Sequence, residues 1–365
     1  MTDIYDVWFT AAFGTAISNA GRIADFGLSP KEIYEIRENL SFYPVFTEKQ
    51  QKAVMSVSLS DVEKRRLEYE KRQVNSINYT DEDYPKRMCG FDNMPLVLYY
   101  KGDLSIMSRD KIVSVVGSRR CNGEGEFASE TISKDITLDG GVVASGLARG
   151  IDTLAHKSCT ANGGKTIAFL GTPITQPYPK RNEDYQHYLE TNHLVVSEYI
   201  PGTRYYNTNF ISRNRLIRAV CDALCVIQAT FKSGSLATVN RALDMGKTVW
   251  AIPGSIFSPA YEGSNNLLYE GKARALCNGH QIMAALGADV ETAEATEPDR
   301  AKPRRAEPLT IEESLILDAI DGAEFSSEIV RKTGINRGVV RSALIEMEVK
   351  GLLVHTANGE YIKKK

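Results

Sequence analysis

The sequence lacks the cysteine and histidine patterns of a structural metal site or a disulfide framework. Its six cysteines include no CxxC pair, and its five histidines are scattered along the chain. Zinc sites need closely spaced pairs of such ligands, and small disulfide-bonded domains need cysteines at regular spacing. We therefore expect no bound metal, and free thiols as in a reducing cytoplasm.

Long hydrophobic runs are also missing. The apolar stretches fall far short of the ~20 residues that a membrane-spanning helix needs. The first residues, MTDIYDVWFT, carry acidic side chains where a secretory signal would be positively charged. These absences predict a cytoplasmic protein with no membrane partner.

A strong excess of positive charge is missing as well. The formal net charge is −2, whereas nucleic-acid-binding domains are commonly basic. The charge is unevenly distributed, because residues 111–290 carry 18 basic and 15 acidic side chains and residues 1–110 carry 14 and 17. This modest surplus excludes a broad electrostatic footprint, but it is compatible with a local basic groove.

The length of 365 residues predicts two or three domains. Residues 1–80 interleave opposite charges at helical spacing, which predicts a helical accessory domain. From Lys111 onward, short apolar runs rich in β-branched residues alternate with helical segments. Apolar runs without polar alternation are typical of strands buried on both faces. Residues 81–290 are thus predicted to form an α/β domain with a doubly wound, mostly parallel Rossmann-type sheet.

The C-terminal part has a different character. Residues 291–307 are charged and lack apolar periodicity, which indicates a linker. Residues 308–365 contain three short helical segments and a hairpin signal at Asn358-Gly359, so they predict a winged helix. Arg337 and Arg341 on its last helix allow a second DNA site. Glu346 and Glu348 on the same helix favour a protein contact instead.

Glycines, hydroxyl groups and cations recur directly after the predicted strands of the α/β domain. GSRR (117–120), SGLARG (145–150) and SGS (233–235) each occupy such a place. Loops after the carboxyl ends of parallel strands share one edge of the sheet. Helix starts and arginine side chains both suit phosphate groups. The pattern predicts a row of phosphate sites, although glycine at any one place also serves an ordinary turn.

Aromatic residues accompany these cations. Tyr178 lies two residues before Lys180, Tyr205 and Tyr206 follow the next strand, and Phe210 begins the run FISRNRLI. Exposed rings stack on the bases of single-stranded nucleic acids. Rings at positions 178 and 210 are equally typical of a packed core, and the sequence leaves both interpretations open.

Two nucleotide-binding fingerprints are absent. The loops contain neither GxxxxGK[ST] nor GxGxxG, and no acid follows the second strand at Ala144-Ser145-Gly146, where a dinucleotide enzyme would hold its ribose. His156 is a lone histidine on a helix, which is more often structural than catalytic. We therefore assign no cofactor and no catalytic residue.

Six segments together resemble one family. VGSR (116–119), ASGLARGIDTLAHK (144–157), YPK (178–180), FISRNRLI (210–217), KSGSLAT (232–238) and VWAIPGS (249–255) are similar to the Rossmann-type domain of the DNA-processing protein A (DprA/Smf) family. The segments occur in family order and spacing over roughly residues 80–280. Gln228 departs from the pattern, since the family typically has an acid there.

The resemblance implies a protein that binds single-stranded DNA, shields it during natural transformation and helps to load the RecA recombinase. It also implies a homodimer formed through the Rossmann-type domains. The DNA-binding residues that the resemblance and the loop chemistry nominate are Gly117, Ser118, Arg119, Arg120, Gly146, Arg149, Lys157, Tyr178, Lys180, Phe210, Arg213, Asn214, Arg215, Ser233, Gly234 and Ser235.

Two alternatives belong to other classes. Phosphoribohydrolases of the lysine-decarboxylase-like (LOG) family have a related fold and a PGGxGTxxE-like loop with a catalytic glutamate. In this chain residues 233–238 are followed by Val239, Asn240 and Arg241, so that carboxylate is missing and we expect no enzyme. The other alternative is an adaptor that binds protein partners and no DNA.

Overall fold

The computed structural model describes residues 1–204, 206–231, 233–290, 309–356 and 359–364. The chain divides into two compact units, Met1–Ala288 and Asp289–Lys365. The predicted linker, residues 291–307, lies outside the described residues. No helix among the described residues is both long enough and apolar enough to cross a bilayer.

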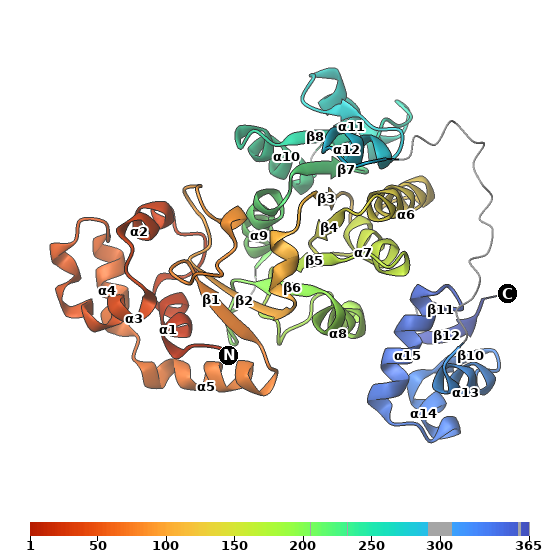
Figure 1. Cartoon of the computed structure of the whole chain (residues 1–365), viewed down its shortest axis with the longest axis horizontal. Helices are drawn as coiled ribbons and strands as arrows, with labels where there is room; N and C mark the ends of the chain where they lie inside the picture. The colour runs from red at the N-terminus through yellow and green to blue at the C-terminus, as the bar shows by residue number, and fades with distance from the viewer. Residues whose placement is uncertain (205, 232, 291–308, 357–358, 365) are drawn as a thin grey trace. The chain divides into compact units, whose positions relative to one another are not determined.

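The first unit is built around a sheet in the order β1-β2-β6-β5-β4-β3-β7-β8-β9 (Figure 1). Strands β3 to β9 pair with one another in parallel, whereas β2 pairs antiparallel with both β6 and β1. The prediction of a mostly parallel, doubly wound sheet is therefore confirmed. The bounds are β1 Asn75–Asn78, β2 Val97–Gly102, β3 Ile112–Val116, β4 Val142–Ser145, β5 Thr166–Phe169, β6 Leu194–Ser197, β7 Ala223–Val226, β8 Thr248–Ala251 and β9 Arg274–Ala275.

Helices cover both faces of this sheet. Helices α6 and α7 pack on one face of β3 and β4, and α9 lies on the other (Figure 1). Every residue of β3 to β7 is buried, which explains their unbroken apolar sequences. The bounds are α6 Gly123–Leu138, α7 Ile151–Ala161, α8 Glu183–Asn192, α9 Asn207–Val220, α10 Gly234–Asp244, α11 Glu262–Tyr269 and α12 His280–Ala285, with 3₁₀ turns at Lys86–Met88, Leu104–Ser108, Lys180–Asn182 and Pro259–Tyr261.

The N-terminal region is helical, as the sequence predicts. Capping boxes that begin at Ser29, Thr47 and Ser58 start three of its helices. The chain then enters the sheet directly as β1, so these helices belong to the same compact unit as the sheet. The bounds are α1 Ile4–Phe13, α2 Ala20–Phe26, α3 Pro30–Glu35, a 3₁₀ turn Arg37–Phe42, α4 Glu48–Ser56 and α5 Leu59–Lys71.

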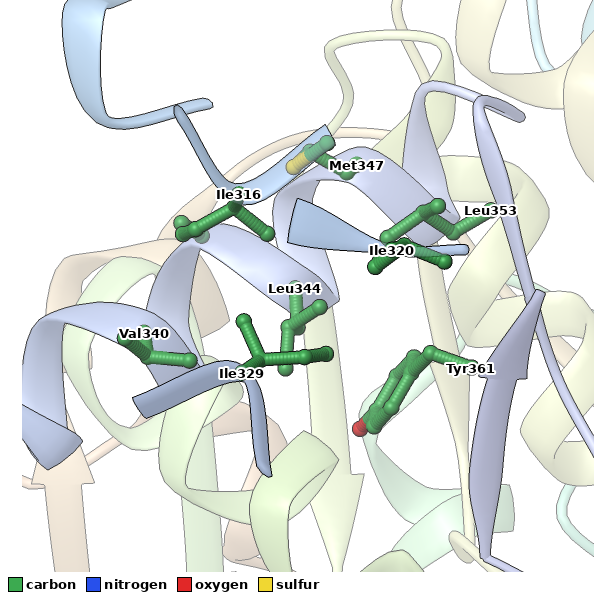
Figure 2. Close-up of a cluster of buried hydrophobic side chains, with 9 residues drawn as sticks. Ile316, Ile320, Ile329, Val340, Leu344, Met347, Leu353 and Tyr361 are labelled. Carbon is green, nitrogen blue, oxygen red and sulfur yellow. The ribbon is translucent and has the colours of Figure 1, made fainter. Parts of the chain in front are cut away.

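The second unit has a core of its own. Ile316, Ile329, Leu344 and Tyr361 meet between its helices and its small sheet (Figure 2). The sheet is antiparallel in the order β10-β12-β11. Three helices and such a sheet are the arrangement of a winged helix, and Asn358 of the predicted turn lies outside the described residues. The bounds are α13 Ile311–Ala319, β10 Ala323–Phe325, α14 Ser326–Thr333, α15 Arg337–Val349, β11 Leu353–His355 and β12 Glu360–Lys363.

Candidate nucleic-acid interface

A pocket of about 230 Å³ opens at the carboxyl end of β3. The strand order reverses there, because the chain proceeds from β3 to β4 on one side and later returns to β7 on the other. Parallel sheets bind ligands at such a reversal. The lining residues are Val116, Gly117, Ser118, Arg119, Ala148, Asp152, Phe210, Ile211, Arg213, Asn214, Ile217, Ser233, Gly234 and Thr238.

The loop after β3 packs closely on the start of α7. A Cβ atom added to Gly117 would lie 2.7 Å from Ile151 Cγ1, so only glycine fits at this position. The Ser118 carbonyl accepts a hydrogen bond from Ile151 N at 3.2 Å. The side chains of Arg119 and Arg120 are exposed. The loop is thus fixed by its backbone and directs two cations toward solvent.

A second pocket, of about 400 Å³, adjoins the first. Both are lined by Arg119, Ala148 and Phe210, so these three residues lie where the two hollows meet. Arg149 is exposed at the second pocket. We call the surface of both pockets the rim; its second half is lined by Arg119, Arg120, Gly146, Ala148, Arg149, Gly171, Tyr178, Pro179 and Phe210.

Two aromatic residues, Tyr178 and Phe210, line the rim. The ring centroids of Tyr178 and Phe210 are 4.9 Å apart, and the Arg119 guanidinium lies 5.4 Å from the Phe210 centroid. Phe210 is only 7% exposed and Tyr178 is 40% exposed. A Cβ added to Gly171 would lie 2.6 Å from the Phe210 ring. Phe210 is therefore a packed residue that supports Tyr178, and part of the Tyr178 ring is exposed to solvent.

Arg213 forms the inner wall of the first pocket. It is 3% exposed, and its Nη1 donates to the Gly146 carbonyl at 2.6 Å and to the Phe169 carbonyl. A Cβ added to Gly146 would lie 2.4 Å from the guanidinium, so this glycine makes room for it. Burial lowers the pKa of Arg213 to about 10, which leaves the group charged at neutral pH. Arg213 ties the ends of β4 and β5 together and adds positive potential to the pocket.

Asp152 lines the same pocket, and it is not among the DNA-binding residues predicted from the sequence. It lies in the first turn of α7, and its carboxylate accepts from Ala148 N at 3.4 Å. Burial raises the pKa of this carboxyl, and Arg213 and Arg119 oppose that shift. The acidic residue that follows the sequence LARG was the signal from which Asp152 could have been predicted as a pocket residue. Thr238 and Ile211 are further pocket residues that were not nominated.

Comparison with known proteins identifies the family. The sequence profile of the DNA recombination-mediator protein A family matches residues 75–287. The chain belongs to this family.

Curated relatives and solved structures agree with this assignment. The DNA processing protein DprA of Streptococcus pneumoniae is 38% identical over 232 residues, which cover 64% of this chain and 81% of the relative. That of Bacillus subtilis is 32% identical, over 60% of this chain and 73% of the relative. The crystal structure of the Streptococcus pneumoniae protein aligns with a TM-score of 0.66 at 32% identity, covering 78% of this chain and 98% of that one.

A second solved structure concerns single-stranded DNA. It describes the single-stranded DNA binding mode of DNA processing protein A from Helicobacter pylori, and it aligns with a TM-score of 0.53 at 26% identity. The alignment covers 59% of this chain and 95% of that chain.

Most of the residues that the sequence predicts to bind DNA lie at the rim. Lys180 is exposed in the 3₁₀ turn directly after Pro179. Ser233 and Gly234 line the first pocket, and the side chain of Ser235 lies outside the described residues, as does Tyr205. Asn214 lines that pocket too and accepts from Arg213 Nε at 3.2 Å.

The nomination of Arg215 as a DNA contact is wrong. Its side chain is 1% exposed, and its Nη2 forms an ion pair with the buried carboxylate of Glu198. Residues two apart on a helix project about 200° from one another. Arg213 therefore faces the rim, and Arg215 faces the opposite side of α9.

Lys157 lies away from both pockets. It is nearly two turns into α7, and its Nζ lies 5.6 Å from the centroid of the Tyr185 ring. His156, its neighbour, is fully buried, with Nδ1 2.6 Å from Thr166 Oγ1. Burial lowers the pKa of His156 to about 3, so the ring is neutral and structural.

The hydrogen bonds of Gln228 explain why this chain has an amide where the family typically has an acid. Its side chain is buried, donates to Asn122 Oδ1 at 2.8 Å and accepts from Asn122 N at 3.3 Å. Asn122 in turn caps α6 by accepting from Gly125 N. An amide can satisfy both groups of Asn122, which a carboxylate cannot.

Among the residues that the structure describes, no cluster of His, Cys, Asp and Glu could hold a metal ion.

Proposed function

We propose that this chain binds single-stranded DNA along the rim. The observation that carries the proposal is that two adjoining pockets share Arg119 and Phe210, which places exposed arginines beside a partly exposed aromatic ring. Arginine side chains and helix starts suit phosphates. The Tyr178 face suits a base, and stacking tolerates every base. The Helicobacter pylori protein, whose single-stranded DNA binding mode is described, is a relative.

The test compares single-stranded and duplex oligonucleotides of equal length by fluorescence anisotropy. Tighter binding of the single strand, weakened by Arg119→Ala, supports the proposal. Equal affinity of the wild type and this variant contradicts it.

The proposal extends to natural transformation. Bound DNA would be shielded from nucleases, and the chain would help to load a RecA-type recombinase onto it. Support comes from the family, whose description is recombination mediation. The test is recombinase filament formation on DNA coated with single-strand-binding protein, with and without this chain. Unchanged filament formation would contradict this part.

Pairing of two chains through the Rossmann-type domains is also part of the proposal. Ile256, Phe257 and Tyr269 are exposed in the segment that connects β8 to β9, and β9 is the edge strand of the sheet. Exposed apolar groups and an open strand edge both favour association. Light scattering should give twice the chain mass for the wild type, and one chain mass for Phe257→Glu combined with Tyr269→Glu.

The proposed function involves no catalysis. The part of α10 where a phosphoribohydrolase would carry its glutamate has Val239, Asn240 and Arg241. Asp152 is the buried carboxylate of the pocket, and its backbone partner Ala148 N holds it at the start of α7. Incubation with nucleoside monophosphates, followed by chromatography for released base, tests this point.

A further inference from the structure

A buried side chain of the helical N-terminal region contacts two loops that support the rim. Tyr69 lies in α5, is fully buried and packs against Tyr99 with ring centroids 5.1 Å apart. Its hydroxyl donates to the Tyr199 carbonyl and accepts from Ile174 N at 3.3 Å. A single oxygen thus joins two loops that are 25 residues apart in the sequence.

The first of these loops supports Tyr178. It runs from the end of β5 to the 3₁₀ turn Lys180–Asn182. Ile174 is buried in its middle, and both of its backbone groups are held, since its carbonyl accepts from Gln186 Nε2 at 2.9 Å. Tyr178 follows four residues later. The hydrogen bonds of Ile174 therefore restrain the loop that leads to Tyr178.

The second loop leads to Phe210. It follows β6, and Tyr199 is buried within it. The Tyr199 hydroxyl donates to the Asn209 carbonyl at 3.2 Å, one residue before Phe210 in α9. The contacts continue from Tyr69 through Tyr199 to α9, the helix that supplies Phe210. Arg65 of α5 lies beside the same loop, because a Cβ added to Gly202 would be 3.8 Å from its Nε.

We propose that Tyr69 is a positioning residue for single-stranded DNA binding. The inference rests on the proposed function, and it assigns the N-terminal helices a role in shaping the rim without touching DNA. A loop held in its bound conformation costs less to order when the ligand arrives. The Tyr69 hydroxyl fixes the two loops that carry Tyr178 and lead to Phe210, so its removal should weaken binding without removing any DNA contact.

The experiment compares two conservative variants of the full chain. Tyr69→Phe removes the hydroxyl that joins the loops. Tyr99→Phe is the matched control, because Tyr99 is equally buried beside Tyr69, but its hydroxyl bonds to Thr10 Oγ1 and the Asp6 carbonyl of α1 and not to the two loops, as far as the described residues show. Each variant loses one buried hydroxyl, so similar losses of overall stability are expected.

Two measurements separate positioning from general destabilisation. Anisotropy with a labelled single-stranded oligonucleotide should show an affinity about three- to tenfold lower for Tyr69→Phe than for wild type, and nearly unchanged for Tyr99→Phe. Hydrogen exchange should be faster in residues 170–179 of Tyr69→Phe alone, because the Ile174 amide has lost its acceptor. The salt dependence of binding should stay the same in both variants, because no phosphate contact is removed.

Three outcomes overturn the inference. Wild-type affinity in Tyr69→Phe, with Arg119→Ala still impaired, would refute the positioning role and leave the proposed function intact. Equal losses in Tyr69→Phe and Tyr99→Phe would show that only stability matters. Absence of single-stranded DNA binding in the wild type would refute the proposed function and this inference together.

Discussion

The guanidinium of Arg119 lies over the ring of Phe210, 5.4 Å from its centroid. This contact places one cation at the junction of the two pockets, since both residues line both of them. The ring is itself packed and the arginine is exposed, so Arg119 is supported from below and open to solvent above. A guanidinium that is held in this way loses little side-chain conformational freedom when it binds a phosphate.

Arg119→Ala should weaken single-stranded DNA binding by roughly five- to tenfold for every sequence, because phosphate contacts carry no sequence information. The slope of log K against log salt should become shallower by about 1. Anisotropy titrations at several salt concentrations measure both effects. Arg109→Ala is the control, because Arg109 is exposed before β3, at the other end of that strand.

Tyr178→Ala should weaken binding by about 1–3 kcal/mol, the usual contribution of one stacked base. Tyr178→Phe should bind like the wild type, because the ring remains. Neither change should alter the salt slope, in contrast to Arg119→Ala. If Tyr178→Ala bound like the wild type, Tyr178 would have no stacking role.

Arg215→Met should lower the free energy of unfolding by about 3 kcal/mol, because it leaves the Glu198 carboxylate buried without its cation. Urea denaturation measures this loss. The double variant Arg215→Met with Glu198→Leu should recover much of it. At temperatures where Arg215→Met is folded, its DNA affinity should match that of the wild type, since Arg215 does not reach the rim.

His156 should make the fold sensitive to acid. Burial lowers its pKa to about 3 in the folded chain, against an ordinary value of 6.5. Below pH 6.5 His156 becomes protonated in the unfolded chain but stays neutral in the folded chain. The free energy of unfolding therefore falls as the pH falls. Relative to His156→Gln, the wild type should lose about 1.4 kcal/mol per pH unit between pH 6 and 4. Parallel pH profiles of the two proteins would contradict this.

Removal of residues 291–365 should change single-stranded DNA affinity by less than about twofold. The C-terminal unit has its own core, and its last helix carries Glu346 and Glu348 as well as Arg337 and Arg341. Few uncompensated cations give little affinity for phosphates. A large loss of affinity, with a shallower salt slope, would show that this unit binds DNA directly.

The sequence predicts strands β3 to β8 well because they are almost wholly buried and consist mostly of apolar residues, but it does not predict β9, whose two residues are exposed. It does not predict β1, whose sequence NSIN has no apolar run and which forms through pairing with β2. Within FISRNRLI the sequence nominates both Arg213 and Arg215. Only the packing of α9 shows that one faces the rim and the other a buried acid.

The pairing of β1 with β2 has a practical consequence for dissecting the molecule. A chain that starts at residue 81 would leave the outer backbone groups of β2 without partners, and such bare edges recruit strands from other molecules. Aggregation of that fragment would say nothing about DNA. A cut after residue 288 respects the boundary between the compact units and keeps every strand of the large sheet.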